Sequence, residues 1–490
     1  MKQKSIKLNF IMNALLTVSS IIIPLISFPY VSRILTPIGT GKVQFAVSTI
    51  AYFTMFAQLG IPTYGIRACA KVREDKEKLT RTAQELLIIN LIMTVIAYAL
   101  LAAAIIFVPR LRDEKILFIV VSTSILLNAI GMEWLFQSLE EYTFITIKSL
   151  IFKVIALVAM FFLIKTEGDY VLYGAYTVFA TVASNILNIF YARKFIQYKP
   201  AGKYNFKQHL KPVLIFFAMA CATTVYNNLD EVMLGFMKGD AEVGLYNAAV
   251  KIKMVLVGLV TSLGAVLLPR LSYYVENKQM EEFKRLCQKA LNFVFLAAVP
   301  LMVYFMIFAK NSILLLSGIK FAGAVVPMQI IMPCVLLIGI TNILGIQILV
   351  PQNREKVVLL SVVAGAIVDL VLNLIFIPKL GAAGAAIGTL VAEITVLIIQ
   401  AVVLRDFLGT FLKNIQFGKI IGGTVAGCAA SFWVLLLPLQ DSMGIELKNF
   451  IILLISAILF FAVDFVILIV TKENFTVETL GQMKAKLKRK

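Results

Sequence analysis

The stretch NNLDEVMLGFMKGDAEVGLYNAAVKIK, residues 227–253, decides how the rest of the chain is interpreted. It carries two acids, Asp230 and Glu231, and two lysines, Lys251 and Lys253, inside otherwise apolar runs. The two runs predict a pair of helices that form a hairpin. Charges inside apolar helices are costly in a bilayer and mark transport pathways or ion pairs. The stretch therefore points to a membrane protein with a polar interior.

Composition supports a membrane protein. The chain has 490 residues, of which 60% are hydrophobic and 15% are charged, and its mean hydropathy is +0.91. Soluble domains are closer to half apolar and a quarter charged. Apolar stretches long enough to span a bilayer as helices recur along the whole chain. The net charge of +19 is explained by basic cytoplasmic loops, so no nucleic-acid partner is expected.

The fold class predicted is an all-α polytopic membrane protein with about fourteen transmembrane helices. The predicted spans lie near 10–31, 43–61, 84–108, 116–136, 147–164, 170–191, 212–237, 243–268, 291–309, 324–350, 357–377, 383–404, 418–437 and 449–471. Prolines inside membrane helices are tolerated where neighbours satisfy the freed carbonyls, and they mark candidate kinks. The candidates are Pro24, Pro29, Pro300 and Pro333.

The distribution of Lys and Arg predicts the orientation. With the N-terminus inside, 32 of the 46 Lys and Arg residues fall in cytoplasmic segments and 11 in outer loops. Cytoplasmic loops carry the excess of positive charge, so both termini are predicted to be cytoplasmic. Two segments in which charges cluster beside apolar positions, 73–87 and 276–291, predict short helices on the membrane surface or solvated connectors.

A weak internal repeat divides the chain. When Gly41 is set against Gly244, an offset of 203 residues also aligns Gln44 with Asn247 and Val47 with Val250. Two repeated six-helix halves are a known way to build a transporter. We therefore expect three parts. They are an N-terminal lobe with spans 1–6 (1–200), a C-terminal lobe with spans 7–12 (201–410), and spans 13–14 with a basic cytoplasmic tail (411–490).

Motifs for enzymatic chemistry are absent from the sequence. There is no phosphate-cradling G-x-x-x-x-G-K-[ST], and the nearest segment, GTGK at 39–42, is a turn between spans. There is no metal-ligand spacing, and the one histidine, His209, lies in a basic loop where a solvated side chain is expected. No Ser-His-Asp set is available. These absences favour a carrier over an enzyme, with no cofactor and no metal.

Charged side chains inside the spans are the candidate site residues, and each has two open interpretations. Asp230 and Lys251 lie at similar depths, about 10 and 12 Å below the outer ends of their spans. They form an ion pair, or Lys251 faces a water-filled cavity. Lys153 either extends to the interface or adds charge to that cavity. Asp369 and Glu393 are candidates for proton coupling, or pair with polar neighbours.

Asp464, in the last span, has the same two interpretations as the other buried carboxylates. Five asparagines inside spans are interpreted as donors and acceptors of hydrogen bonds between helices. They are Asn128, Asn185, Asn188, Asn342 and Asn373.

Five segments, in order along nearly the whole chain, resemble one family. They are FPYVSRILTPIGTGKVQFA (28–46), LGIPTYGIRACAK (59–71), EWLFQSLEEYTFITIKS (133–149), LDEVMLGFMKGDAEVGLYNAAVKI (229–252) and NLIFIPKLGAAGAAIGTLVAE (373–393). Together they resemble the polysaccharide-transporter flippases of the multidrug/oligosaccharidyl-lipid/polysaccharide exporter superfamily. Asp369 stands where an Asn is expected in that family, so a proton role for Asp369 would be specific to this chain.

The resemblance implies a function and a location. It implies a flippase that moves undecaprenyl-diphosphate-linked oligosaccharide repeat units across the bacterial cytoplasmic membrane by alternating access. A diphosphate needs cationic partners, and the candidates are Arg33, Arg67, Lys153 and Lys251. The candidates for ion coupling are Asp230, Asp369 and Glu393. Membrane lipids and other polysaccharide-assembly proteins are the expected partners.

Other functions remain open at this point. A drug/cation antiporter of the same superfamily would favour an acidic cavity, and a peptidoglycan-precursor flippase fits the quoted segments less well. From the enzyme class, a membrane polysaccharide polymerase or acyltransferase is disfavoured by the short outer loops.

Overall fold

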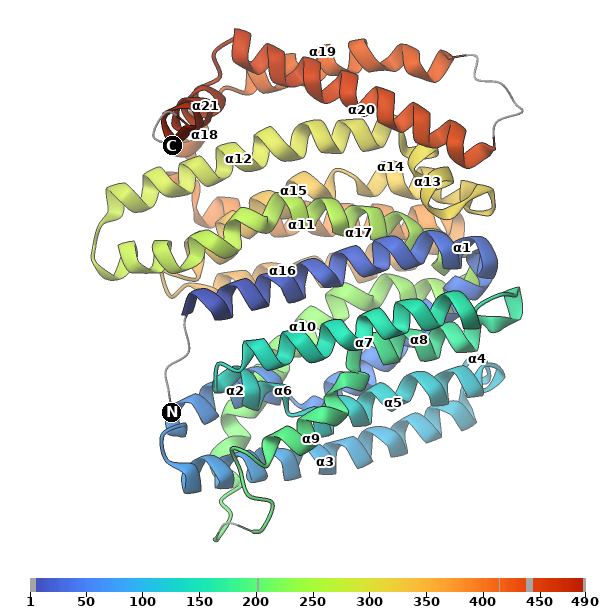
Figure 1. Ribbon diagram of the computed structural model, residues 1–490, viewed down its shortest axis with the longest axis vertical. Coiled ribbons are helices and arrows are strands. Elements are labelled where there is room, and N and C mark those ends of the chain that lie inside the picture. Colours follow the sequence, from blue (N-terminus) through green and yellow to red (C-terminus); the bar gives the residue numbers. More distant parts are fainter. Residues whose placement is uncertain (1–5, 201, 414, 438–443, 488–490) are drawn as a thin grey trace. The chain divides into compact units, whose positions relative to one another are not determined.

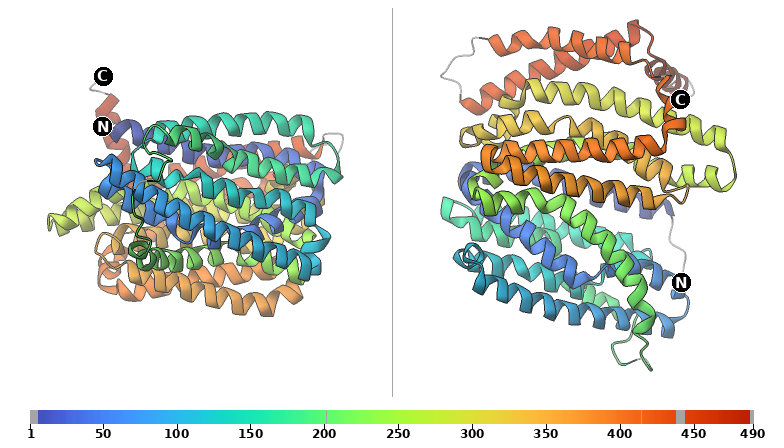
Figure 2. Two further views of the ribbon diagram at one scale, coloured as in Figure 1. Left: turned by 90° about the horizontal axis from the view of Figure 1, so that it is seen from below. Right: turned by 180° about the vertical axis from the view of Figure 1, so that it is seen from behind.

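The computed structural model of the chain describes residues 6–200, 202–413, 415–437 and 444–487. These residues form helices and no strand, which confirms the predicted all-α class. Contacts divide the chain into two compact units, Met1–Gly244 and Leu245–Lys490. Within each unit the axes of the long helices are roughly parallel, and the chain passes up and down between them (Figures 1 and 2). The three predicted domain ranges stay predictions.

The first unit is built from ten α-helices and two short 3₁₀ segments. They are α1 (Ile6–Gln58), α2 (Ile61–Val72), α3 (Lys76–Phe107), α4 (Pro109–Asp113), α5 (Lys115–Gly131), α6 (Glu133–Ser138), α7 (Tyr142–Leu163), η1 (Glu167–Asp169), α8 (Tyr170–Val182), η2 (Ala183–Asn185), α9 (Ile186–Ala192) and α10 (Lys207–Met237). In this unit α1 is central, because it contacts α3, α5, α7, α8 and α10.

The next helix, α11 (Asp240–Glu276), begins in the first unit and continues into the second. The remaining elements belong to the second unit. They are α12 (Met280–Ile307), α13 (Ala309–Ser317), η3 (Ile319–Ala324), α14 (Val325–Ile331), α15 (Cys334–Thr341), η4 (Asn342–Leu349), α16 (Glu355–Leu380), α17 (Ala382–Val403), α18 (Arg405–Lys413), α19 (Phe417–Phe432), η5 (Trp433–Leu436), α20 (Ile445–Val470) and α21 (Asn474–Leu487).

The span count agrees with the sequence once two breaks are considered. Twelve helices of the described residues are long and apolar enough to cross a membrane, and a pair bent by 44° adds a thirteenth. The bend lies between Ile331 and Cys334, so Pro333 is a kink as predicted. The 53 residues of α1 would extend about 80 Å, far more than one bilayer. Since Thr36 has a φ of 61° inside α1, this helix comprises two spans and gives a fourteenth.

Neither of the two amphipathic segments is a separate surface helix, so that interpretation was wrong. Residues 73–87 and 276–291 instead form turns followed by the first turns of α3 and α12, which continue into the membrane spans. Asp75 caps α3 by accepting hydrogen bonds from the backbone N–H groups of Lys78 and Glu77. The hydrogen bond from Lys78 lowers the pKa of the Asp75 carboxyl below its ordinary value. The cap fixes where α3 begins.

A short helix that the sequence did not predict, α2, follows α1 directly. Its buried face carries Ile61, Gly65 and Cys69, spaced by four residues as on one side of a helix. A Cβ atom at Gly65 would lie 2.7 Å from the ring of Trp134 in α6, so the two helices pack closely. This contact fixes the buried face of α2 against α6.

The two glycines that the repeat aligned, Gly41 and Gly244, make a reciprocal contact within the first unit. A Cβ atom at Gly41 would lie 1.8 Å from the carbonyl oxygen of Asp240, and one at Gly244 would lie 2.0 Å from that of Pro37. Pro37 and Asp240 are themselves separated by the same 203 residues as the glycines. In each copy of the repeat the missing side chain of the glycine therefore allows the backbone of the other copy to approach closely. Asp240 also forms an ion pair with Arg110.

Candidate functional site

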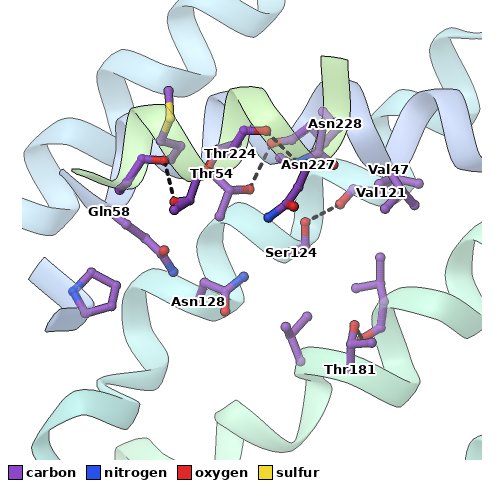
Figure 3. Close-up of a pocket in the computed structure, with 18 of the residues that line it drawn as sticks. Val47, Thr54, Gln58, Val121, Ser124, Asn128, Thr181, Thr224, Asn227 and Asn228 are labelled. Atoms are coloured by element: carbon purple, nitrogen blue, oxygen red, sulfur yellow. Dashed lines mark hydrogen bonds between the residues drawn. The ribbon is translucent and has the colours of Figure 1, made fainter. Parts of the chain in front are cut away.

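A cavity of about 480 Å³ lies inside the first unit, between α1, α2, α5, α8 and α10. Eleven of its 21 lining residues carry a hydroxyl or an amide, and none carries a charge. The eleven are Thr54, Gln58, Thr63, Ser124, Asn128, Thr177, Thr181, Thr223, Thr224, Asn227 and Asn228. Figure 3 labels most of these side chains around the cavity, among them Gln58, Asn128 and Asn227. We call this space the neutral cavity.

Most hydroxyls of the neutral cavity are fixed by their own helices. Thr54 donates to the carbonyl of Ile50 at 2.9 Å, and Ser124 donates to that of Val121 at 2.7 Å. Thr181 donates to the carbonyl of Thr177 at 2.6 Å. These hydrogen bonds use the hydroxyl protons and leave the oxygen lone pairs to accept from a ligand.

Three amides of the neutral cavity, Gln58, Asn128 and Asn227, make no hydrogen bond with another described residue. Each amide offers two donors and a carbonyl acceptor. Asn128 was predicted to bond a neighbouring helix, and the structure contradicts this because its side chain lines the cavity. The prediction holds for Asn188, which donates to the carbonyl of Gly131, and for Asn185, which accepts from Lys148. Amides with open hydrogen-bonding capacity suit a ligand rich in hydroxyl groups.

A second pocket, of about 430 Å³, follows along α2 and α10. It is lined by Tyr64, Arg67, Ala68, Lys71, Lys211, Pro212, Ile215 and Phe216. The guanidinium of Arg67 lies 5.7 Å from the centre of the Phe216 ring, a cation–π distance. We call this the cationic pocket.

Gly60 lines the neutral cavity at the turn from α1 into α2. Its φ of 73° is left-handed, which glycine adopts without steric cost. A Cβ atom here would lie 2.4 Å from the backbone nitrogen of Phe217, so the turn from α1 to α2 touches α10 directly. The neutral cavity uses α10 from Ala220 onward, and the cationic pocket uses α10 up to Phe216. Ala220 lies four positions after Phe216, or about 6 Å along the helix.

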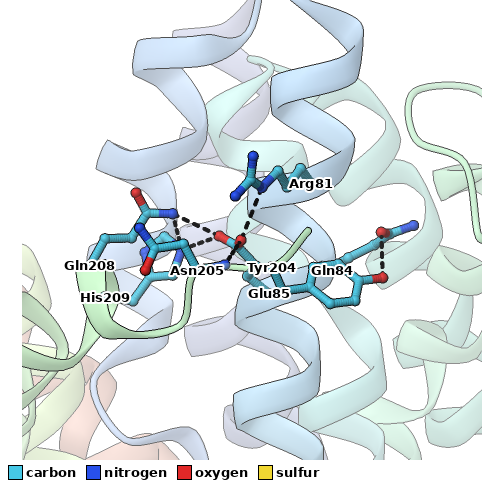
Figure 4. Close-up of polar contacts among 7 residues, drawn as sticks. All are labelled: Arg81, Gln84, Glu85, Tyr204, Asn205, Gln208 and His209. Carbon is cyan, nitrogen blue, oxygen red and sulfur yellow. Dashed lines mark hydrogen bonds and ion pairs between the residues drawn. The ribbon is translucent and has the colours of Figure 1, made fainter. Parts of the chain in front are cut away.

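A buried polar network supports the cationic pocket (Figure 4). His209 is buried, so the expectation of a solvated histidine was wrong. Its Nε2 lies 2.7 Å from Glu85, and its Nδ1 lies 2.8 Å from the hydroxyl of Tyr64. Glu85 is fully buried and also accepts from the backbone N–H of Asn205 at 2.6 Å. The network therefore connects α2, α3 and α10.

Comparison with known sequences supports one family. The family described as "Polysaccharide biosynthesis protein" matches residues 6–275, which is more than half of the chain. The chain belongs to this family. Its predicted membership of the polysaccharide-transporter group is thereby confirmed, and a second family, MatE, matches residues 215–375.

Two bacterial relatives cover most of the chain. The "Putative O-antigen transporter" of Escherichia coli (strain K12) is 24% identical over 404 residues, covering 82% of this chain and 97% of the relative. A protein of the same description from Shigella dysenteriae is 27% identical over 401 residues, covering 80% and 98%.

Solved structures show the same fold. "Lipid II flippase MurJ, inward closed conformation" superposes with a TM-score of 0.72 at 15% identity and covers 94% of this chain and 99% of that one. An inward-facing multidrug resistance MATE family transporter of the MOP superfamily gives 0.62 at 17% identity, with 81% and 96% covered. At these identities the likeness defines the fold alone.

The four predicted cations of this family member occupy different surroundings. Arg67 lines the cationic pocket. Lys153 is buried in α7 and donates to the hydroxyls of Ser19 and Ser20 in α1, at 3.0 and 2.7 Å. Arg33 lies in α1, just before the break at Thr36, and its guanidinium donates to the carbonyl of Pro29. Lys251 lies in α11, in the second unit, and is partly buried.

The three predicted carboxylates are all buried. Asp230 lies in α10 of the first unit, and Asp369 and Glu393 lie in α16 and α17 of the second. Gly388 of α17 faces Asp369, because a Cβ atom there would lie 2.8 Å from Asp369 Oδ1. Since Asp230 and Lys251 belong to different units, their ion pair stays a prediction.

The sequence did not point to the neutral cavity. Its side chains are threonines, serines and amides scattered over five helices, and no two of the helices share a motif. The only available signal was the run Thr223, Thr224, Asn227 and Asn228 in α10, where polar residues follow one another at helical spacing. That run lies directly before Asp230 and Glu231, and the sequence-based prediction selected the charged residues and not the neutral ones.

Proposed function

We propose that this protein is a flippase that moves undecaprenyl-diphosphate-linked oligosaccharide repeat units across the bacterial cytoplasmic membrane. The observation that carries the proposal is the neutral cavity, placed within the spanning helices of a polysaccharide biosynthesis protein. The names of the E. coli and S. dysenteriae relatives support the same substrate class.

The chemistry of the neutral cavity fits a saccharide. Sugar hydroxyls donate and accept hydrogen bonds and carry no charge, so they need neutral partners of both kinds. The amides of Gln58, Asn128 and Asn227 supply donors and acceptors, and the helix-bonded threonines supply acceptors. A drug cation would instead favour carboxylates, and no carboxylate lines this cavity. The neutral lining therefore favours a glycan over an antiporter substrate.

The mechanism proposed is alternating access, with the glycan crossing through the protein while the lipid tail remains in the bilayer. Arg33, Arg67, Lys153 and Lys251 are the proposed cationic contacts of the diphosphate. Asp230, Asp369 and Glu393 are the proposed groups for coupling to an ion gradient, because buried carboxylates exchange protons or bind cations. Both termini are proposed to be cytoplasmic, and other polysaccharide-assembly proteins are the proposed partners.

Reconstitution tests the proposal directly. The full-length protein is placed in vesicles that carry a fluorescent undecaprenyl-diphosphate oligosaccharide, and a membrane-impermeant glycosidase reports how much glycan becomes accessible. The expected result is transfer that depends on the protein. Deletion of the gene should also leave lipid-linked repeat units on the cytoplasmic face and remove surface polysaccharide. Unchanged surface polysaccharide and precursor distribution in the deletion strain would refute the proposal.

A further inference from the structure

The cationic pocket holds three positive side chains without a matching carboxylate. Arg67, Lys71 and Lys211 form no salt bridge with a described residue, whereas three cations on the turn and helix that follow α2 are paired. Arg73 pairs with Glu140 at 2.8 Å, and Lys78 pairs with Asp75 at 2.9 Å. The pocket therefore carries three positive charges that no lining carboxylate neutralises.

The pocket is built from fixed elements. On α2, Arg67 and Lys71 are four residues apart and share a face, next to the face that packs on Trp134. Tyr64, on the same helix, is bonded to His209, which Glu85 holds from α3. These contacts set the distance between α2 and the start of α10 before any ligand arrives. Preorganisation of this kind reduces the entropy lost on binding.

The surroundings of the pocket indicate an amphiphilic ligand. On α10, Leu210, Leu214 and Ile215 are about half exposed, and Ile215 also lines the pocket. A free polar anion makes no favourable contact with exposed aliphatic side chains at its site. A lipid with a phosphate headgroup satisfies both features, because its phosphates pair with the cations and its chain covers the leucines and Ile215.

We infer that the cationic pocket binds the phosphate groups of a lipid headgroup. The lipid is either the polyprenyl diphosphate of the substrate or an anionic phospholipid of the bilayer. The first source rests on the proposed function, and it gives the pocket a role. With its diphosphate held between α2 and α10, the attached glycan would begin about one helical turn away, at the neutral cavity.

The test uses the full-length protein in phosphatidylcholine nanodiscs, titrated with undecaprenyl diphosphate and, separately, with phosphatidylglycerol. Binding is measured by native mass spectrometry for the wild type and for R67Q/K71Q/K211Q. The matched control, K199Q/K203Q/K207Q, also removes three positive charges, from exposed lysines of the first unit that do not line the pocket. Equal thermal unfolding midpoints verify that both variants fold.

The expected result is at least about tenfold weaker binding of undecaprenyl diphosphate to the pocket variant, with the control within about twofold of wild type. Equal weakening for both lipids supports the phosphate site with a bilayer phospholipid as occupant. Selective weakening for undecaprenyl diphosphate supports the substrate as occupant. Unchanged binding of both lipids, or equal losses in the pocket and control variants, overturns the inference.

The outcome is separable from the proposed function. Transport of the glycan by the wild type tests the function, and loss of lipid binding in the pocket variant tests the site. If the wild type binds lipid at the pocket but transfers no glycan, the site stands and the function fails. If transfer is normal and binding to the variant is unchanged, the function stands and the site fails.

Discussion

The neutral cavity and the cationic pocket follow one another along α10, yet they carry opposite kinds of side chain. The first holds hydroxyls and amides without charge, and the second holds three cations without a carboxylate. A diphosphate-linked glycan has the same division, with a charged end and a neutral end. The difference shows that a membrane protein can keep charged side chains and neutral hydrogen-bonding side chains in separate cavities.

Glu85→Ala should have the largest effect on the difference between the two regions. It removes the support of the cationic pocket and does not touch the neutral cavity. Glu85 is fully buried and accepts from His209, Gln208 and Asn205. We expect a loss of about 3 to 5 kcal/mol in unfolding free energy, as when one partner of a buried ion pair is removed. Denaturant titration in detergent micelles measures it.

The matched control for Glu85 is Glu140→Ala. Its salt bridge with Arg73 is more than one third exposed on both sides, so we expect a loss below about 1 kcal/mol. Equal losses at Glu85 and Glu140 would contradict the assignment of Glu85 as the support of the pocket.

Gly60→Ala should disturb both regions together, because Gly60 lines the neutral cavity and contacts α10, which lines both. The added Cβ meets the backbone of Phe217, and alanine is strained at a φ of 73°. We expect a loss of about 2 to 4 kcal/mol in unfolding free energy and reduced binding at both places. Gly202→Ala is the control, since Gly202 has the same φ but no atom within 4 Å of the added Cβ. A loss no greater than that of the control would show that the turn can move away from α10.

Asn128→Asp should sharpen the comparison by placing a charge in the neutral cavity. The substitution keeps the shape but removes two donors and adds a carboxylate that a neutral glycan cannot compensate. We expect transfer of a neutral lipid-linked glycan to fall about tenfold in the vesicle assay, with unchanged binding of undecaprenyl diphosphate. Asn277→Asp, in the exposed turn after α11, makes the same chemical change outside the cavity. Equal transfer rates for the two variants would argue against glycan contact at Asn128.

Arg67→Lys should have the smallest effect, because it keeps the charge of the cationic pocket. Lysine lacks the planar fork that holds two phosphate oxygens, and it stacks less well on Phe216. We expect binding of undecaprenyl diphosphate to weaken about threefold, with glycan selectivity unchanged. A loss as large as that of the triple glutamine variant would mean that guanidinium geometry, rather than charge, determines binding.

The fold was largely predictable because each helix that spans a bilayer requires a long apolar run in the sequence. The long apolar helices follow from hydropathy, and the bend beside Pro333 coincides with a proline inside a predicted span. The helix α2 was missed because its twelve residues are too few to span a membrane and its apolar face is only one stripe. Its position depends on Gly65 meeting Trp134, a contact between residues far apart in sequence.

The candidate site was less predictable. Arg67 was selected by its sequence position and the family resemblance, and it lines the cationic pocket, while its role stays a prediction. His209 was misjudged because its partners, Glu85 and Tyr64, lie more than a hundred residues away. Asn128 was misjudged because an asparagine in a span is equally suited to bond a helix or a ligand, and only packing decides which.

The reciprocal contact of Gly41 and Gly244 also bears on how the chain can evolve. Each copy of the repeat holds a glycine for the other copy's backbone, so neither position can drift alone. A larger residue at 41 displaces the backbone at 240, and a larger residue at 244 displaces the backbone at 37, in each case in the other copy. Sequences related to this one should therefore keep glycine at both places, because steric exclusion acts on each copy of the repeat.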